Sequence, residues 1–243
     1  GRQKLSELNL IASKKAIKLS SFESAAKYAG KGIDFLDERT WEKDDYMVPL
    51  QLYSIGAKAE GFLGNLDVME QYCKTVISKQ KIPLKHKLEV YCTWVEGMLG
   101  RSGVAEAAVL TIEVLSKYNC VFPKTRAIVK VNIVANLFHL KRKLKHLDTS
   151  KLPNMNDDSR VALLNLLDHL SYFSYMLNDC RMPLIMFRSL MWTFEYGISA
   201  YSASSFSSTA LVLIGVLNDI QGGALFGEHA LSILKNTESS ATA

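Results

Sequence analysis

The sequence is poor in the residues that interrupt or cross-link a chain. Its 243 residues include only five prolines, fourteen glycines and four cysteines. The prolines and glycines are spread along the whole length, so no segment has the composition of a linker between independent parts. With 48% hydrophobic and 22% charged residues, the chain can bury a substantial core. We therefore expect one continuous domain over residues 1–243.

Long hydrophobic runs are also lacking. The most apolar stretch near the C-terminus, residues 210–214, is interrupted by Gly215 and is far shorter than the roughly 20 residues of a membrane-spanning helix. The first residues contain no apolar segment of a secretory signal. These features predict no membrane insertion and a cytoplasmic location. The chain does not begin with Met, which suggests a fragment of a larger multidomain protein, although a trimmed N-terminus would look the same.

The motifs that hold metal ions or nucleotides are absent as well. The four cysteines are Cys73, Cys92, Cys120 and Cys180. They are widely spaced among apolar neighbours, so we expect buried thiols rather than zinc ligands. The Gly30-Lys31-Gly32 segment lacks the third glycine of a dinucleotide fingerprint, and a helix interior explains it better. We predict no catalytic, cofactor-binding or metal-binding residue, no small-molecule substrate and no enzymatic activity in this segment.

Apolar residues recur at helical spacing along most of the chain. One stripe consists of Phe22, Ala25, Ala26, Ala29, Ile33 and Leu36, the one before it of Leu5, Leu8, Ala12, Ala16 and Leu19, and a later one of Ile128, Val131, Ala135 and Phe138. Such stripes are typical of helices that bury one face, and we count about eleven. No segment combines the alternation and turn signals of a strand.

Short turns separate these helices at a regular interval. They lie at residues 20–21, 64–65, 101–103 and 221–223, and the first three are spaced by about forty residues, as in helical repeats. Residues 148–158 are predicted to form a longer loop. Gly56, Gly97 and Gly215 interrupt helical segments and are expected where helices pack closely. The predicted fold is all-α, a right-handed stack of antiparallel helix pairs in a tetratricopeptide-like α-solenoid.

Several segments resemble a known family of helical repeats. They are residues 8–16, 22–28 and 32–36, then Trp41, residues 50–53 and 65–70, and the later landmarks 121–123, 196–197 and 226–231. Together they resemble the helical-repeat region of large multi-sensor signalling kinases, over roughly Lys4 to Leu234. In that family the repeats follow a predicted AAA-like ATPase domain. The resemblance implies a regulatory region of such a chain and transfers no catalytic residue.

One dense basic cluster stands out. It consists of Lys141, Arg142, Lys143 and Lys145, followed by His146. The cluster lies in the more basic part of the chain. Through Thr149 there are 24 basic and 16 acidic residues, and from Ser150 onward there are 5 basic and 8 acidic residues. The four cations are the candidate partner-binding residues, for an acidic protein surface. The alternative is structural, because cations also stabilise the C-terminal end of a helix.

The leading functional hypothesis is a non-catalytic interaction and regulatory module of a signalling ATPase-kinase, coupling neighbouring domains or protein partners. Nucleic acid is not the expected partner. A stand-alone adaptor that binds a peptide in its concave groove is the first alternative. A helical enzyme with an unrecognised site is the second.

Overall fold

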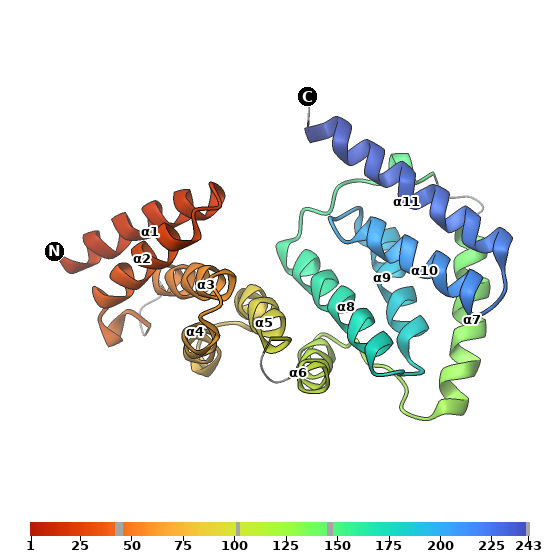
Figure 1. The fold of residues 1–243 in the computed structure, drawn as a ribbon, viewed down its shortest axis with the longest axis horizontal. Coiled ribbons are helices and arrows are strands. Elements are labelled where there is room, and N and C mark those ends of the chain that lie inside the picture. The colour runs from red at the N-terminus through yellow and green to blue at the C-terminus, as the bar shows by residue number, and fades with distance from the viewer. Residues whose placement is uncertain (42–45, 101–102, 145–147, 242–243) are drawn as a thin grey trace. The chain divides into compact units, whose positions relative to one another are not determined.

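The regular structure of the protein is helical. The computed structural model describes residues 1–41, 46–100, 103–144 and 148–241 (Figure 1). Over these ranges it contains eleven α-helices, two short 3₁₀ helices and one isolated β-bridge, between Asn154 and Ile198. The predicted all-α class is therefore confirmed. None of the described helices combines the length and the apolar character that a membrane crossing requires.

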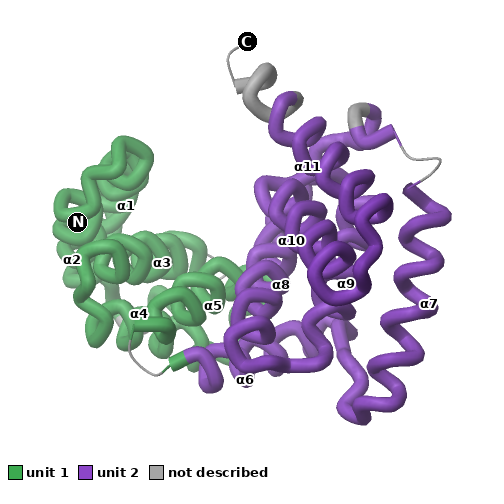
Figure 2. Tube along the Cα trace, turned by 45° about the vertical axis from the view of Figure 1, so that its right-hand side comes forward, with its two compact units in different colours: residues 1–103 green, residues 104–243 purple. Residues whose placement is uncertain are grey.

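The chain divides into two compact units, residues 1–103 and 104–243 (Figure 2). The helices of the first unit are α1 (Arg2–Lys18), α2 (Phe22–Asp34), η1 (Glu38–Trp41), α3 (Met47–Phe62), α4 (Leu66–Ser78) and α5 (Leu84–Met98). Each α-helix of this unit packs on the next, and α3 also packs on both α1 and α5. That the whole chain is a single domain stays a prediction.

The second unit begins with two helices that do not follow this simple succession. Its helices are α6 (Val104–Ser116), α7 (Arg126–Leu144), η2 (Thr149–Lys151), α8 (Asp158–Met176), α9 (Met182–Tyr196), α10 (Ser202–Gly215) and α11 (Ile220–Ala241). The last four helices pack on one another in order. In contrast, α6 packs on α8 and α7 packs on α9.

Four helices end at the same kind of turn. A leucine is followed by a residue in the left-handed region, namely Ser20 (φ 55°), Gly64 (φ 80°), Asn178 (φ 55°) and Asn218 (φ 51°). After three of these residues the next backbone N–H donates to the carbonyl five residues earlier, at distances of 2.8–2.9 Å. This hydrogen bond closes the helix end and reverses the chain within about three residues.

Each of these left-handed residues is followed within four residues by the start of the next helix. Ser21 and Asn65 are the N-cap residues of α2 and α4. Asp179 Oδ1 accepts a hydrogen bond from the Arg181 N–H at 2.9 Å, and Asp219 Oδ1 accepts one from the Gly222 N–H at 3.0 Å. Carboxylates at these places satisfy amides that a helix start leaves unpaired. The turns thereby pair α1 with α2, α3 with α4, α8 with α9, and α10 with α11.

Two of the three glycines expected at close helix contacts lie at such contacts. A Cβ atom on Gly56 would stand 3.0 Å from Tyr72, and one on Gly97 would overlap the terminal methyl of Met69. Gly215 was predicted wrongly, because no atom of a neighbouring helix lies within 4 Å of its Cβ position. It stands at the exposed C-terminal end of α10, where no helix crosses it.

The first three helices meet through alanine side chains. Ala25 of α2 and Ala59 of α3 are fully buried and form a cluster with Ala16 of α1. Small side chains permit a close approach of the three helices. The expected stripe on α1 is wrong in part, since Leu5, Leu8 and Leu19 are exposed and the buried positions include Ser6 and Ser13. Residues that are small enough for the crossing occupy the inner face in place of the leucines.

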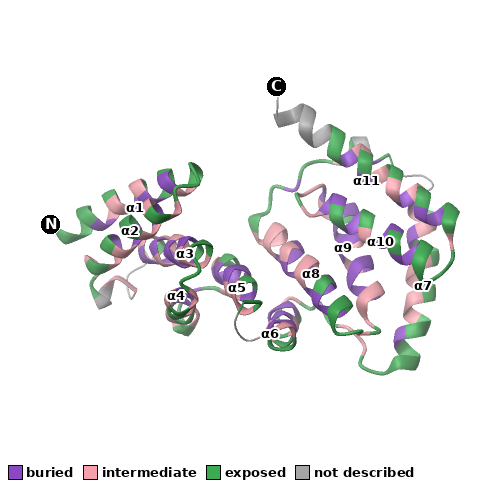
Figure 3. Ribbon diagram, in the orientation of Figure 1, coloured by how far each residue is buried: buried purple, intermediate pink, exposed green. Residues whose placement is uncertain are grey.

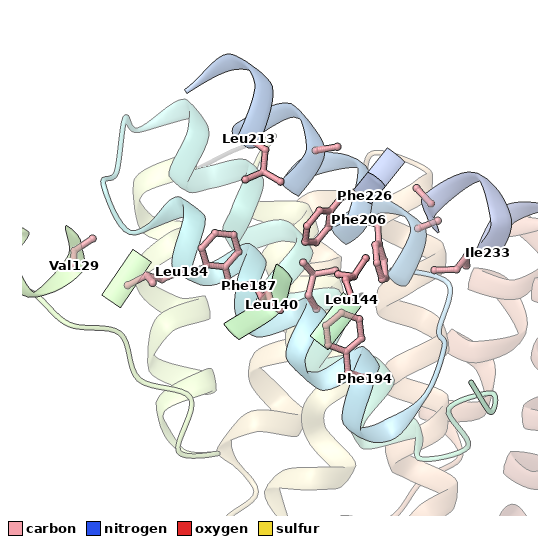
Figure 4. Packing of buried hydrophobic residues seen from close by; sticks show 14 residues of the cluster. Val129, Leu140, Leu144, Leu184, Phe187, Phe194, Phe206, Leu213, Phe226 and Ile233 are labelled. Atoms are coloured by element: carbon pink, nitrogen blue, oxygen red, sulfur yellow. The ribbon is translucent and has the colours of Figure 1, made fainter. Parts of the chain in front are cut away.

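The second unit has a core of aromatic and aliphatic side chains. Phe187, Phe206 and Phe226 come from α9, α10 and α11, and all three are fully buried (Figure 4). The ring centroids of Phe206 and Phe226 are 6.0 Å apart. Such ring pairs add to the stabilisation from apolar burial.

The stripe expected to be buried on α7 faces solvent. Ile128, Val131, Ala135 and Phe138 are all exposed, whereas Val129, Leu140 and Leu144 are buried (Figure 3). This helix has apolar residues on two opposite sides, so periodicity identified a real stripe and assigned it to the wrong face.

The predicted loop at residues 148–158 contains ordered structure. Thr149–Lys151 forms η2, and the Met155 N–H donates to the Ile198 carbonyl at 2.8 Å. The Ile198 N–H in turn donates to the Pro153 carbonyl at 2.7 Å. These bonds fix the segment to the end of α9 before α8 begins.

The alanine cluster predicts that added volume at Ala25 destabilises the fold. Ala25→Leu should lower the free energy of unfolding by about 1–3 kcal/mol, because the site has no room for three more carbon atoms. Lys27→Leu, at an exposed position of the same helix, is the matched control and should change stability little. Urea denaturation followed by circular dichroism measures both. Equal stability of Ala25→Leu and the parent would contradict the contact of α1, α2 and α3.

Candidate functional site

A hollow opens where α3, α4 and α5 meet. It has a volume of about 240 Å³ and is lined by Lys58, Gly61, Phe62, Leu66, Met69, Thr93, Glu96, Gly97 and Gly100. Its floor is the contact of Met69 with Gly97, where the missing side chain lets the two helices approach. The volume is below the roughly 300–1,000 Å³ of small-molecule sites, so the hollow suits a single apolar side chain of a bound peptide.

The rim of this hollow combines an aromatic ring with two opposite charges. Phe62 is 61% exposed, and its ring stacks on Phe22 with 4.3 Å between the centroids. Lys58 and Glu96 are both exposed. A ring that is already held in place loses little side-chain entropy when a ligand packs on it. The sequence did not predict this site; the only signal for it was the glycine content of the α3 and α5 segments.

The predicted basic cluster is partly used within the fold. Lys141 forms an ion pair with Asp219, which lies between α10 and α11. The Nζ of Lys143 lies 5.3 Å from the ring centroid of Phe194, within the range of a cation–π contact. Arg142 is exposed. Lys145 and His146 lie outside the described residues, and partner binding by the four cations stays a prediction.

The ion pair with Asp219 joins α7 to the turn between α10 and α11. The hydrogen bond from Lys141 is the main cause that lowers the pKa of the Asp219 carboxyl, and the bond from the Gly222 N–H also lowers it. A Cβ atom on Gly222 would overlap the Asp219 carboxylate, so a side chain at this position would require the carboxylate to move. The sequence gives no signal for this pair because its members are far apart in the chain.

Two histidines lie in polar contacts within the fold. Nδ1 of His86 is 2.8 Å from the Tyr46 hydroxyl, and Nδ1 of His229 is 3.0 Å from the Thr149 hydroxyl. Burial lowers the pKa of His229, while the nearby carboxylates of Glu228 and Asp148 raise it. Within the described ranges, no group of three or more His, Cys, Asp or Glu side chains could hold a metal ion.

The cysteines differ from expectation at one position. Cys73, Cys92 and Cys120 are buried as predicted, but Cys180 is exposed at the turn between α8 and α9. Burial raises the pKa of the Cys73 thiol to about 12 and that of Cys120 to about 11, so both are protonated and unreactive at neutral pH. Asp179 and Arg181 flank Cys180 directly, and these charged neighbours were the signal in the sequence that this cysteine lies in an exposed turn.

Gly30-Lys31-Gly32 lies inside α2, as the helix-interior interpretation predicted. A Cβ atom on Gly32 would stand 2.6 Å from a methyl of Leu52 in α3. This glycine therefore serves helix packing. Comparison of the chain with protein-family models, curated proteins and solved structures finds no match.

The ion pair predicts a pH-dependent contribution to stability. Folding lowers the pKa of Asp219, so below the usual aspartate pKa of about 4 the folded chain binds fewer protons than the unfolded chain. The contribution is thus complete above that pH and is lost as the pH falls through the lowered pKa. Lys141→Met should be slightly less stable than the parent at pH 7, and the difference should vanish in acid.

Arg142→Met is the matched control, because it removes a neighbouring exposed charge without breaking the pair. Thermal unfolding of both variants between pH 2 and pH 7 provides the measurement. A stability loss of the same size for both variants, or one that persists in acid, would contradict the pairing of Lys141 with Asp219.

Proposed function

We propose that this chain is a non-catalytic helical-repeat module that binds protein segments, with a tetratricopeptide-like arrangement of its helix pairs. The observation that carries the proposal is the hollow lined by α3, α4 and α5, in which α3 and α5 are next-but-one neighbours that pack on each other. In helical repeats, equivalent helices of successive pairs pack side by side and line one common surface. The packing of α1 on α3 and of α3 on α5 agrees with that arrangement.

The turns support the same proposal. The left-handed residues after α1 and α3 occur at equivalent places, 44 positions apart in the numbering as Ser20 and Gly64. Each lies between a leucine and an N-cap residue. A stack of helix pairs is built by repeating the same turn in each pair, and it needs no catalytic residues. The resemblance to signalling kinases further supports a regulatory role beside an ATPase and kinase domains.

The hollow also indicates what a partner would present. An apolar side chain would enter between Phe62 and Met69, while polar groups beside it would contact Lys58 and Glu96. An extended or helical peptide offers both in neighbouring residues. Under the stand-alone adaptor hypothesis the hollow binds a peptide in the same way. That hypothesis differs only in that the chain acts alone and not as part of a signalling ATPase-kinase.

The test is selection of peptides on the purified chain. A phage-displayed library of short peptides should yield binders that contain an apolar anchor residue. Phe62→Ser should weaken them about tenfold or more, since it removes the main exposed contact of the rim. Val109→Ser, which removes a comparably exposed apolar side chain from α6, is the matched control and should leave affinity unchanged.

Binders that are equally affected by both substitutions would contradict the assignment of the hollow. Calorimetry with ATP tests the non-catalytic part of the proposal, which predicts no heat of binding. Micromolar ATP binding would contradict it and favour the enzyme hypothesis.

A further inference from the structure

Helix α7 has an apolar face that the fold leaves uncovered. Its inner face packs Val129, Leu140 and Leu144 into the core of the second unit (Figure 4). On the opposite side lie Ala127, Ile128, Val131, Val134, Ala135 and Phe138, which we call the outer stripe, and all six are exposed. The exposed fractions of Val131, Val134 and Phe138 are 70%, 70% and 72%.

Such a continuous stripe differs from the single exposed apolar residues that most protein surfaces carry. Single apolar residues on a surface need no explanation, but a contiguous apolar face usually marks an interaction site. The six residues fall on one side over three turns of helix: five follow the spacing i, i+4, i+7, i+8 and i+11 from Ala127, and Ile128 lies at the border of the same side. A helix that is apolar on both sides is normally enclosed on both sides.

The place of α7 in the chain explains why its outer side is open. The helices of four pairs are joined by turns of three to five residues. In contrast, α7 is joined to α6 by residues 117–125 and to α8 by residues 145–157. It packs on α9 without belonging to one of these turn-linked pairs. No helix linked to α7 by a short turn therefore covers its outer face.

The charged side chains that α7 itself carries are all basic, and Lys141 among them is paired with Asp219. The sequence has no acidic residue between Glu113 and Asp148. Arg142 is exposed four residues after Phe138, which places it in line with the stripe one turn further on. Lys130 is exposed along one border of the stripe, and Arg126 is exposed at its N-terminal end. A complementary surface would be apolar with acidic borders.

We propose that the outer stripe docks an amphipathic helix of a partner protein whose apolar face is bordered by Asp and Glu. The small side chains of Ala127 and Ala135, between Ile128, Val131 and Phe138, form grooves that the ridges of another helix can enter. This inference deepens the proposed function and rests on it, since it names a second surface and its partner. The surface lies in the second unit, and the hollow lies in the first.

Two other occupants fit the stripe less well. Two copies of α7 placed face to face would bring two helices without acidic residues together, and their cations would repel. Helices that lie on membranes place large apolar side chains in the lipid and keep a strongly charged opposite face in water. The opposite face of α7 is instead packed in the protein core.

The experiment uses a designed helical peptide with Leu at positions a, d and e of each heptad and Glu at the remaining positions. Fluorescence anisotropy of the labelled peptide with the whole chain should show saturable binding that weakens with salt. A peptide with Lys in place of Glu should bind at least tenfold more weakly. Failure of the Glu peptide to bind, or equal binding of the Lys peptide, would overturn the proposal.

Substitutions then locate the binding surface. The double variant Val131→Ser with Phe138→Ser should weaken Glu-peptide binding at least tenfold and leave the thermal midpoint unchanged. The matched control, Val109→Ser with Leu211→Ser, removes two similarly exposed apolar side chains outside α7 and should bind as the parent does. Arg142→Ser should reduce the salt dependence. Equal weakening by both double variants, or a loss of stability in the α7 variant, would overturn the proposal.

Two further measurements exclude the other occupants. Sedimentation velocity should show a monomer, and a dimer that the α7 double variant abolishes would overturn the proposal in favour of a second copy. Co-sedimentation with phosphatidylserine vesicles that depends on the outer stripe would overturn it in favour of a membrane surface. Phe62→Ser should leave Glu-peptide binding intact, so failure of the hollow and failure of the outer stripe are distinguishable.

Discussion

The left-handed residue at the helix end is the constraint on which the pairing of helices depends. At Ser20, Gly64, Asn178 and Asn218 the chain adopts a positive φ, and the next helix begins within four residues. Serine in this region is uncommon, while Gly and Asn enter it more readily. The turn brings consecutive helices together along their lengths, and small residues then determine how closely they approach.

The pairing also explains where a binding surface can arise. Within the first unit, α3, α4 and α5 pack together and leave the hollow that Met69 and Gly97 help to line. In the second unit, α7 lacks a turn-linked partner and keeps the outer stripe uncovered. Both surfaces combine apolar side chains with charged ones, as protein interfaces do at their centre and rim. The way in which short turns pair some helices and leave others unpaired therefore accounts for both proposed sites.

The sequence predicted the helices better than their orientation. The stripe with Ala25 and Ala29 lies in the buried face of α2, because that helix has one apolar side only. In α1 and α7 two apolar sides compete, and only the shape of the neighbouring helices decides between them. Packing at Gly56 could be predicted from the cost of glycine within a helix.

The sites could be predicted only in part. The basic cluster was visible as a run of charges, but its contact with Asp219 depends on the tertiary fold. The hollow depends on the juxtaposition of α3 and α5, and the exposure of Cys180 on the position of a turn. Local sequence patterns contain no information about such contacts between distant residues.

The claim most central to this account is that α7 presents an apolar face to solvent. It can be measured with single cysteines at two neighbouring valines, Val129 with no exposed surface and Val131 with 70%. In a Cys180→Ser background, native Val131→Cys should react with a maleimide as fast as an exposed thiol, and Val129→Cys should react only after unfolding. The opposite order of reactivity would show that α7 turns its other face outward and would contradict the account.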